Sequence, residues 1–309
     1  MDEPFSGIRE FVATVDSGSL TGAAALLGVT GSAVGKAISR LEARLGVQLL
    51  HRTTRRMDLT TEGEAYLVSC RRVLEELAQT QSFLATGQQR PVGRLRVDLP
   101  TTFGRRHVLP ALLELGTRHD GLDLSVTLRD RAVDMVGEGI DLAVRIGVLS
   151  DYPDLVARRL GEQTLVICAA PAYLARRGTP ATHADLARHD CLVGWRRGNR
   201  PMWFLKNAQG QSALQEIPVR HDLFDGDALE SACLAGCGLA QLPTWLAGES
   251  LRSGALVPVL AGLTGGAMPI HVVWQKTWHL QPKVRVTVDA LAQLAAATPA
   301  IFNTGPPVV

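Results

Sequence analysis

Long apolar runs are missing from this sequence of 309 residues, although 46% of the residues are hydrophobic. No stretch approaches the roughly 18 uncharged apolar residues of a membrane-spanning helix, so we expect no membrane partner. The first residues, MDEPFSGIRE, are acidic and mixed, unlike a secretory signal with its basic and then apolar regions. These absences favour a cytoplasmic protein.

Cysteine is scarce, and its spacing is unlike that of a structural site. There are five cysteines and no CxxC pair, so we expect neither a zinc ribbon nor a disulfide framework. Cys233 and Cys237 are four residues apart, which places them on one face if their segment is helical. We predict that the cysteines are small buried side chains, with a redox switch as the alternative.

Signatures of catalysis are missing too. The sequence has no GxSxG elbow, no HExxH and no P-loop, and its eight histidines are scattered without metal-ligand spacing. The Gly236-Cys237-Gly238 run follows a predicted helix rather than a strand, which is typical of a helix C-cap. We therefore predict that the protein is not an enzyme and uses no cofactor or metal.

Positive charge is concentrated in one short segment. The formal net charge is +2 overall but +5 over residues 36–56, where six basic residues face one acid, Glu42. A basic segment on a mildly acidic chain predicts a polyanionic partner for that segment alone. The alternative is a solvated helix face.

The segment around this basic run has the pattern of a helix-turn-helix. Apolar spacing over residues 8–15 predicts one amphipathic helix. Ser19 and Thr30 are placed to cap a second helix over residues 20–27 and a third that ends near Leu45. The third helix has an apolar inner face and a polar outer face, and an outer face of this kind can enter a major groove. Its expected outward residues are Ser32, Lys36, Ser39 and Arg40.

The following segment, VQLLHRTTRRMDLTTEG, predicts two short strands joined by a basic tip. Arginines at the tip of such a hairpin, or wing, can enter a minor groove or contact phosphates. Helix, turn and basic wing occur in the order that binding to duplex DNA requires, which favours a nucleic-acid partner over the solvated face.

This segment resembles the N-terminal domain of LysR-type transcriptional regulators. The likeness is carried by the runs GSLTGAA, LGV, SAV, ISRLE and LLHRTTRRMDLTTEG. Gly31 and Gly35 depart from the family pattern, in which many members have polar side chains. The resemblance and the helix pattern together give the expected DNA-binding residues Thr30, Ser32, Lys36, Arg40, Arg52, Thr53, Thr54, Arg55 and Arg56.

Residues 62–86 predict one long helix with a heptad seam. The expected seam residues are Leu67, Cys70, Leu74, Leu77, Gln81 and Leu84. Such a seam can pack on the twin helix of a second subunit or on the head of the same chain. The resemblance implies a linker helix that forms a homodimer or homotetramer, with dimerisation through Leu67, Leu74, Leu77, Gln81 and Leu84.

From residue 94 onward, predicted strands alternate with predicted helices, which indicates α/β architecture with a small parallel sheet and crossover helices. Strands are expected at 95–99, 122–128 and 141–147, with a short helix over 132–139 before the third. A second unit of the same kind starts at residue 164, and a last strand and helix follow from residue 270.

The resemblance extends over this part through DLAVRIG, APAYLARRGTP, HADLARHDCLVGW, DGDALESACLAGCGLAQLP and PKVRVTVDALAQL. It implies an effector-binding domain like a periplasmic binding protein, with two lobes and a cleft. The expected domains are a winged helix-turn-helix (1–61), a linker helix (62–88), a hinge (89–93), an effector-binding domain (94–300) and a disordered tail (298–309). Lobe I would take about 94–162 and 268–297, and lobe II about 163–267.

Ligands of open parallel sheets bind at the carboxyl ends of the strands. Residues expected there are Thr101, Thr102, Arg129, Asp130, Arg145 and Ile146, with Trp203, Phe204 and Phe224 as an apolar wall from the other lobe. Hydroxyls and free N–H groups at a helix start suit an organic anion. The alternatives are plain helix capping by the threonines, core positions for Trp203 and Phe204, and an ion pair of Arg145 with Asp141 or a neighbouring loop.

Together these features predict a regulator of transcription that binds double-stranded DNA at an imperfect inverted repeat. The resemblance implies control by a small-molecule effector between the lobes and action through RNA polymerase, which would place the protein at the nucleoid. The alternative is a cytoplasmic small-molecule receptor whose basic head binds a protein.

Overall fold

The computed structural model describes residues 5–52, 57–86, 90–131, 133–149, 154–194, 196–197, 200–207, 209–264, 266–276 and 281–303. The chain divides into two compact units, Met1–Gln89 and Arg90–Val309. We call the first unit the head and the second the regulatory unit. Each is described by itself.

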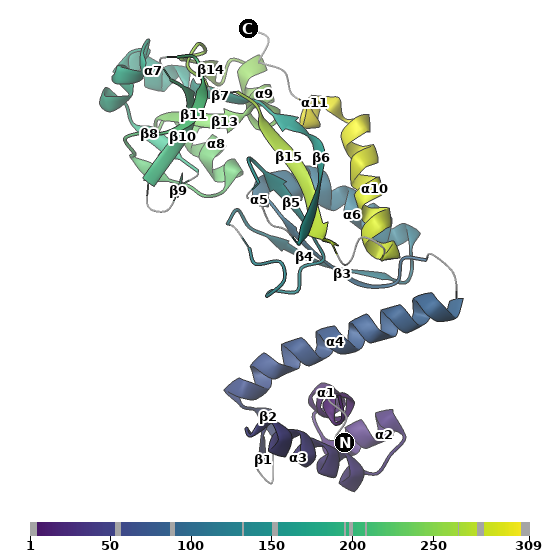
Figure 1. Cartoon of the computed structure of the whole chain (residues 1–309). Helices are drawn as coiled ribbons and strands as arrows, with labels where there is room; N and C mark the ends of the chain where they lie inside the picture. Colours follow the sequence, from purple (N-terminus) through teal and green to yellow (C-terminus); the bar gives the residue numbers. More distant parts are fainter. Residues whose placement is uncertain are drawn as a thin grey trace. The chain divides into compact units, whose positions relative to one another are not determined.

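The head is built from helices and one hairpin (Figure 1). Its elements are α1 (Ile8–Ser17), α2 (Leu20–Leu27), α3 (Gly31–Leu45), β1 (Leu50–Arg52), β2 (Met57–Leu59) and α4 (Thr61–Thr86). The chain bends by 105° between α2 and α3, and β1 pairs with β2 in an antiparallel hairpin. Phe11, Val34 and Ile38 are fully buried at the centre of the head.

No single described helix is long and apolar enough to cross a membrane, and α2 and α3 reach that threshold only as a bent pair.

The first sheet of the regulatory unit belongs to what we call lobe I. Its strand order is β4-β3-β5-β15-β6, with β3 parallel to β4 and β5, and β15 antiparallel to β5 and β6. The parallel sheet expected from the sequence is therefore mixed. The strands are β3 (Gly93–Leu99), β4 (Leu122–Leu128), β5 (Leu142–Ile146), β6 (Leu155–Gln163) and β15 (Met268–Gln275).

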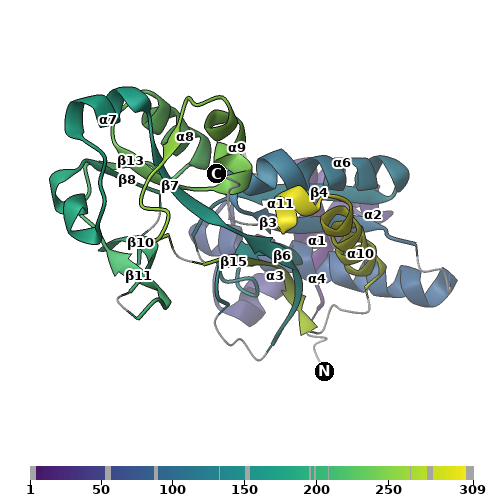
Figure 2. The same cartoon turned by 90° about the horizontal axis from the view of Figure 1, so that it is seen from above.

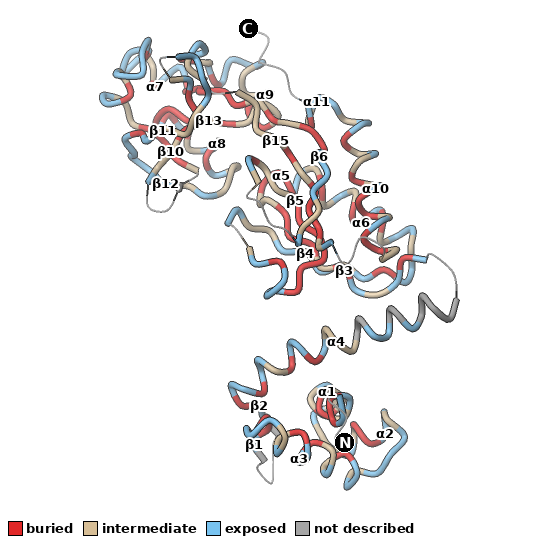
Figure 3. Tube along the Cα trace, viewed as in Figure 1, coloured by how far each residue is buried: buried red, intermediate tan, exposed pale blue. Residues whose placement is uncertain are grey.

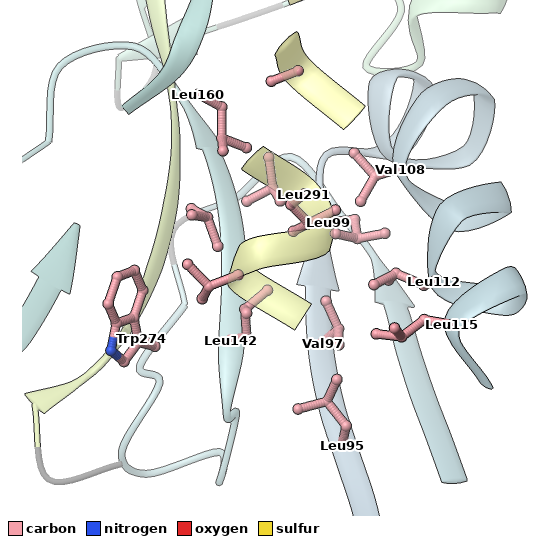
Figure 4. Packing of buried hydrophobic residues seen from close by; sticks show 14 of the residues in the cluster. Leu95, Val97, Leu99, Val108, Leu112, Leu115, Leu142, Leu160, Trp274 and Leu291 are labelled. Carbon is pink, nitrogen blue, oxygen red and sulfur yellow. The ribbon is translucent and has the colours of Figure 1, made fainter. Parts of the chain in front are cut away.

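Lobe I has one main core. Residues that alternate along β3, namely Leu95, Val97 and Leu99, pack with Leu112 and with residues of the C-terminal helix (Figure 4). The helices on this face are α5 (Thr101–Phe103), the π-helical η1 (Gly104–Val108), α6 (Leu109–Arg118), α10 (Pro282–Ala297) and α11 (Pro299–Phe302). A smaller cluster that contains Met135, Ala143 and Val273 packs on the sheet's other face.

Two expectations for lobe I are wrong. The segment expected as a helix over 132–139 forms turns at 135–139, where Asp134 Oδ1 accepts hydrogen bonds from the N–H groups of Val136 (3.1 Å) and Gly137 (2.9 Å). The tail expected to be disordered over residues 298–309 begins instead with α11, and its residues 304–309 lie outside the described residues. Phe302 is fully buried in the core of lobe I, and the backbone of Asn303 forms an isolated parallel β-bridge with Glu162.

Lobe II is a second five-stranded sheet, with the order β12-β8-β13-β7-β14. Its elements are β7 (Leu165–Ala169), α7 (Pro171–Arg177), η2 (His183–Arg188), β8 (Cys191–Val193), β12 (His221–Asp222), α8 (Gly226–Leu234), β13 (Leu239–Pro243), α9 (Thr244–Arg252) and β14 (Val257–Pro258). A small antiparallel sheet, β11-β10-β9, adds Ser212–Glu216, Arg200–Lys206 and Arg196–Arg197. Alternate residues of β7 enter two cores, which explains why its sequence is apolar throughout.

The chain passes from lobe I to lobe II at Thr164, between β6 and β7, and returns before β15 (Figures 1 and 2). Buried segments follow the sheet strands of both lobes (Figure 3). Four of the five cysteines are buried, but Cys237 is exposed and lies beyond the end of α8. It therefore does not share a helix face with Cys233. Gly236 has a φ of 73°, the left-handed conformation expected of a helix-ending turn.

Candidate nucleic-acid interface and effector site

The two helices of the helix-turn-helix begin at side-chain caps. Ser19 Oγ accepts a hydrogen bond from Gly22 N (2.9 Å), and Thr30 Oγ1 accepts one from Ala33 N (3.2 Å). Val34, Ile38 and Leu41 turn one side of α3 into the head core. The opposite side is consequently exposed, and it carries Ser32, Lys36, Ser39 and Arg40.

Two charged residues of the basic segment work inside the head rather than on this surface. The Glu42 carboxylate accepts hydrogen bonds from Leu49 N (2.9 Å) and Leu50 N (3.2 Å), which attaches the start of the wing to α3. Arg44 donates to the Ser6 carbonyl (2.9 Å). The only acid of the run is therefore used internally, and the exposed side of α3 is left basic.

The structure at the base of the wing explains why residue 63, at the end of the LLHRTTRRMDLTTEG run, is glycine. Thr60 Oγ1 donates to the Gln48 carbonyl (2.7 Å) and accepts from Gly63 N (2.9 Å), so this hydroxyl starts α4 and holds the wing. A Cβ atom at Gly63 would lie 2.1 Å from the Leu49 carbonyl oxygen. Only glycine fits this approach. The expected wing-tip residues Thr53, Thr54, Arg55 and Arg56, and the side chain of Arg52, lie outside the described residues.

The predicted seam of α4 divides into two parts. Leu67 and Cys70 are buried in the head core, and Leu74 packs against it. Leu77 is 46% exposed, and Gln81 is exposed as well. The first half of the seam thus belongs to the chain's own head, and among the described seam residues only Leu77 and Gln81 are open to another subunit. The side chain of Leu84 is not among those described.

At the carboxyl ends of the lobe I strands, the expected arginines meet a buried acid. The Asp98 side chain on β3 is fully buried and ion-paired with Arg129 and with Arg145, whose Nη1 lies 2.7 Å from Asp98 Oδ1. Arg129 also pairs with Glu138 at 2.6 Å. The hydrogen bond to Asp98 raises the pKa of Arg129. Arg145 does not pair with Asp141, which instead binds Lys283 at 3.1 Å.

The expected threonines also have partners within the chain. Thr101 N donates to Asp130 Oδ1 (3.1 Å). Thr102 Oγ1 accepts from Gly226 N in lobe II (2.8 Å) and donates to Asp225 Oδ2 (3.4 Å). The donors that we expected to hold an organic anion are therefore engaged by the chain's own groups.

The expected apolar wall is only partly present. Trp203 is 3% exposed and lies in the core of lobe II, as the alternative interpretation had it. Phe204 is half-buried, with its backbone N–H and C=O both hydrogen-bonded to the Gln241 amide (2.8 and 2.9 Å). Phe224 is 57% exposed, next to Asp225. Ile146 packs against the lobe I core.

Sequence interpretation missed Asp98, Asp225 and Arg105 as members of this region. Asp225 caps α8 by accepting from Ala228 N (3.0 Å), and Asp before an apolar periodic run is a recognisable helix start. Burial alone would raise the pKa of Asp225, but the Ala228 N–H and the Arg105 guanidinium outweigh it, so this pKa lies below its ordinary value. Asp98 gives no comparable signal, because an acid in an alternating strand usually faces solvent.

A helix-turn-helix head joined to a two-lobed α/β unit defines a class of regulator that reads DNA with one unit and a small molecule with the other. Comparison with known protein families agrees. A model of the "LysR substrate binding domain" matches residues 88–296, and one of the "Bacterial regulatory helix-turn-helix protein, lysR family" matches residues 5–64. The chain belongs to the LysR family of transcriptional regulators, so the predicted family and fold class are confirmed.

Individual relatives extend over nearly the whole chain. It is 36% identical over 292 residues to HTH-type transcriptional regulator DmlR of Escherichia coli (strain K12), covering 94% of each protein. It is 34% identical over 284 residues to HTH-type transcriptional regulator CrgA of Neisseria meningitidis serogroup C, covering 92% of this chain and 94% of the relative. The solved structure of CrgA, a LysR-type transcriptional regulator from N. meningitidis, superposes with a TM-score of 0.59 at 32% identity, covering 94% of this chain and 98% of that one.

These relatives are transcriptional regulators, a family of non-enzymes that bind DNA and small-molecule effectors. The predictions of a DNA-binding regulator with an effector domain and of no enzymatic activity are therefore confirmed. The alternative of a receptor with a protein-binding head has no support.

Proposed function

We propose that the protein binds an imperfect inverted repeat in double-stranded DNA as a homodimer or homotetramer. The exposed side of α3 enters the major groove, with Thr30, Ser32, Lys36 and Arg40 toward bases and phosphates. The basic wing tip from Arg52 to Arg56 lies along the flanking minor groove. The observation that carries this proposal is the basic, exposed side of α3, from which the only acid of the run is turned away.

The second half of the α4 seam supports subunit pairing. Leu77 and Gln81 remain exposed after Leu67 and Cys70 are covered by the head. An apolar seam on a long helix is stabilised by a twin helix. Two heads joined in this way would reach successive major grooves, and the complex would act through RNA polymerase in the cytoplasm.

The effector site proposed for the regulatory unit lies at the carboxyl ends of β3, β4 and β5, beside the contact of Thr102 with Gly226 of lobe II. The charges of Arg129 and Arg145 are neutralised by Asp98 and Glu138. The Thr101 N–H already donates a hydrogen bond to Asp130. An anionic effector would have to displace these carboxylates. We therefore propose a neutral or weakly charged small molecule in place of the organic anion, with exposed Phe224 as an apolar contact.

The DNA proposal is tested by measuring the affinity of the full chain for fragments selected from genomic DNA. Removing a phosphate or base contact typically costs about 1–3 kcal/mol and lowers the salt slope of log K by about one unit. Lys36→Ala and Arg40→Ala should each weaken binding by this amount. Arg9→Ala removes the same charge from an exposed position on α1 and serves as the control. Unchanged affinity and salt slope in both α3 variants would remove α3 from the interface.

A further inference from the structure

One irregular helix of lobe I makes a continuous set of contacts with lobe II. It is formed by α5 and η1, residues 101–108, directly after β3. Its first contact is Thr102, whose hydroxyl accepts from Gly226 N at the start of α8 (2.8 Å). A Cβ atom at Gly226 would lie 2.9 Å from Thr102 Oγ1. The two lobes therefore touch directly at this point.

The next residues of the same helix carry charge toward α8. Arg105 Nη2 lies 3.3 Å from Asp225 Oδ2 and also pairs with Asp227. Arg106 Nη2 lies 2.5 Å from Asp227 Oδ1 and 4.0 Å from Glu230 Oε2. Two guanidinium groups of lobe I thus meet three carboxylates of lobe II, two on α8 and one on its N-cap residue, Asp225. We call these five residues the inter-lobe latch.

Aromatic contacts lie beside the latch, toward α9. The Trp245 ring of lobe II meets Phe103 edge-on with centroids 5.4 Å apart, and His107 at 5.0 Å. Phe103 in turn contacts Phe302 of α11 at 5.3 Å. Trp245 Nε1 donates to Gln163 Oε1 (2.8 Å), at the end of β6 where the chain crosses between lobes. This side of the junction is apolar and anchored.

The π-helical segment η1 lies close against β3 at its first residue, Gly104. A Cβ atom at Gly104 would lie 2.4 Å from Leu99 Cβ, so glycine lets the helix start close against β3. Short π-helical segments inside α-helices occur frequently at functional sites. Here the segment GRRHV presents two consecutive arginines to α8 and the next residue, His107, to Trp245.

The latch and the aromatic contacts differ in how easily they open. Arg105 and Arg106 are 45% and 42% exposed, whereas Phe103 is buried and Trp245 of lobe II packs against the lobe I core. Ion pairs at such exposure are weak and are screened by salt. Separating the lobes at the latch is therefore easier than separating them at the aromatic contacts. The aromatic contacts keep one side of the inter-lobe junction together, and the ion pairs on the other side can dissociate.

We propose that Arg105 and Arg106 are positioning residues for effector control, and that they hold α8 against lobe I in the absence of effector. This proposal rests on the proposed function of the regulatory unit. Phe224 directly precedes the latch residue Asp225, so a ligand that moves Phe224 also moves a partner of Arg105. An effector shifts the balance between latched and released states by binding one of them better.

The Gly226 amide gives a direct readout of the latch, because its hydrogen-bond acceptor lies on the other lobe. Hydrogen–deuterium exchange of the full chain should show faster exchange at residues 224–230 in the double variant Arg105→Gln/Arg106→Gln, by about tenfold at Gly226. Exchange in β13 should stay unchanged. Arg105→Lys/Arg106→Lys keeps the charge and should restore most of the protection. Arg118→Gln, which removes an i,i+4 pair with Glu114 on α6, is the matched control.

A second measurement separates the latch from the proposed function. Footprints on the selected DNA, without effector, should differ between wild type and the double glutamine variant but not between wild type and Arg118→Gln. Unchanged exchange at Gly226 in the double variant would overturn the latch. Faster exchange with a footprint identical to that of wild type would overturn its regulatory role. A wild-type protein that binds no DNA would instead refute the proposed function, and the exchange measurement would still decide on the latch.

Discussion

Basic side chains do opposite work in the two units of this protein. On α3 of the head, Lys36 and Arg40 stand on an exposed face, and the neighbouring acid Glu42 is turned inward to the wing. At the strand ends of lobe I, Arg129 and Arg145 are mostly buried and share the fully buried Asp98. The same residue type thus offers its charge to a partner molecule in one unit and has it neutralised in the other.

The difference follows from what lies behind each side chain. The apolar side of α3 fills the head core, which forces the polar side outward whatever it carries. In lobe I, sheet pairing brings Asp98 beside β4 and β5, where its charge needs compensation once it leaves water. A cation becomes part of the fold where tertiary structure supplies a buried acid, and it stays available for binding where none is supplied.

Removing the shared acid should break this arrangement with the largest effect. Asp98→Asn leaves Arg129 and Arg145 without their buried carboxylate, and breaking a buried pair in this way costs about 3–5 kcal/mol of unfolding free energy. All five tryptophans lie between residues 195 and 278, so tryptophan fluorescence during urea unfolding reports the regulatory unit alone.

Asp123→Asn is the control for this experiment, because Asp123 is exposed on neighbouring β4. Equal unfolding midpoints for the two variants would mean that the arginines do not depend on Asp98.

The glycine at the start of α4 should produce the next largest effect. Gly63→Ala places a methyl group against the Leu49 carbonyl, which requires a backbone shift in the wing or in α4. Overpacking of this kind costs typically about 1–3 kcal/mol. The loss should appear in the head as faster hydrogen exchange of α3 and α4, with the tryptophan signal of the regulatory unit unchanged. A head as stable as that of wild type would show that the wing adapts without strain.

His107 should make the regulatory unit sensitive to acid. Burial, and to a lesser extent the charge of Arg106, lowers the pKa of His107 in the folded state. Below a pH of about 6.5 the unfolded chain binds a proton that folded His107 does not, so stability is complete above that pH and falls as the pH decreases. One such proton changes the unfolding free energy by up to about 1.4 kcal/mol per pH unit.

His107→Gln should flatten the fall in tryptophan-detected stability as the pH decreases below about 6.5. His183→Gln, at an exposed position on η2, should leave the slope unchanged. The prediction is contradicted if both variants lose stability with acid as steeply as wild type.

The sequence was informative where structure is local. Ser19 and Thr30 cap α2 and α3 as predicted, because caps and apolar periodicity act within a few residues of chain. The DNA-binding residues chosen from that pattern remain predictions, although the described ones, on and before α3, are exposed.

The partners of the strand-end residues depend on contacts distant in sequence. Arg145 was expected at an effector site, with an ion pair to Asp141 or a neighbouring loop as the alternative. Sheet register instead pairs Arg145 with Asp98, and Asp141 pairs with Lys283 on α10. The helix expected over 132–139 fails because Asp134 holds the following N–H groups in a turn and Gly139 takes a φ of 65°. The latch could not be predicted either, since Arg105 and Asp227 meet only after both lobes have formed.

The smallest predicted effect concerns a second glycine in the head and has the opposite sign. Gly35 lies inside α3, and a Cβ atom there would meet only Leu20 Cδ1, at an ordinary 3.6 Å. Packing does not require glycine at this position, and glycine inside a helix costs about 0.5–1 kcal/mol relative to alanine. Gly35→Ala should therefore stabilise the head by about that amount and slow hydrogen exchange along α3. Paired with Gly63→Ala, it separates a glycine that the fold needs from one that it does not.

If Gly35→Ala also weakens DNA binding while stabilising the head, close approach of α3 to the duplex is the remaining reason for glycine at this position. Unchanged DNA affinity would place the Gly35 side of α3 away from the bases.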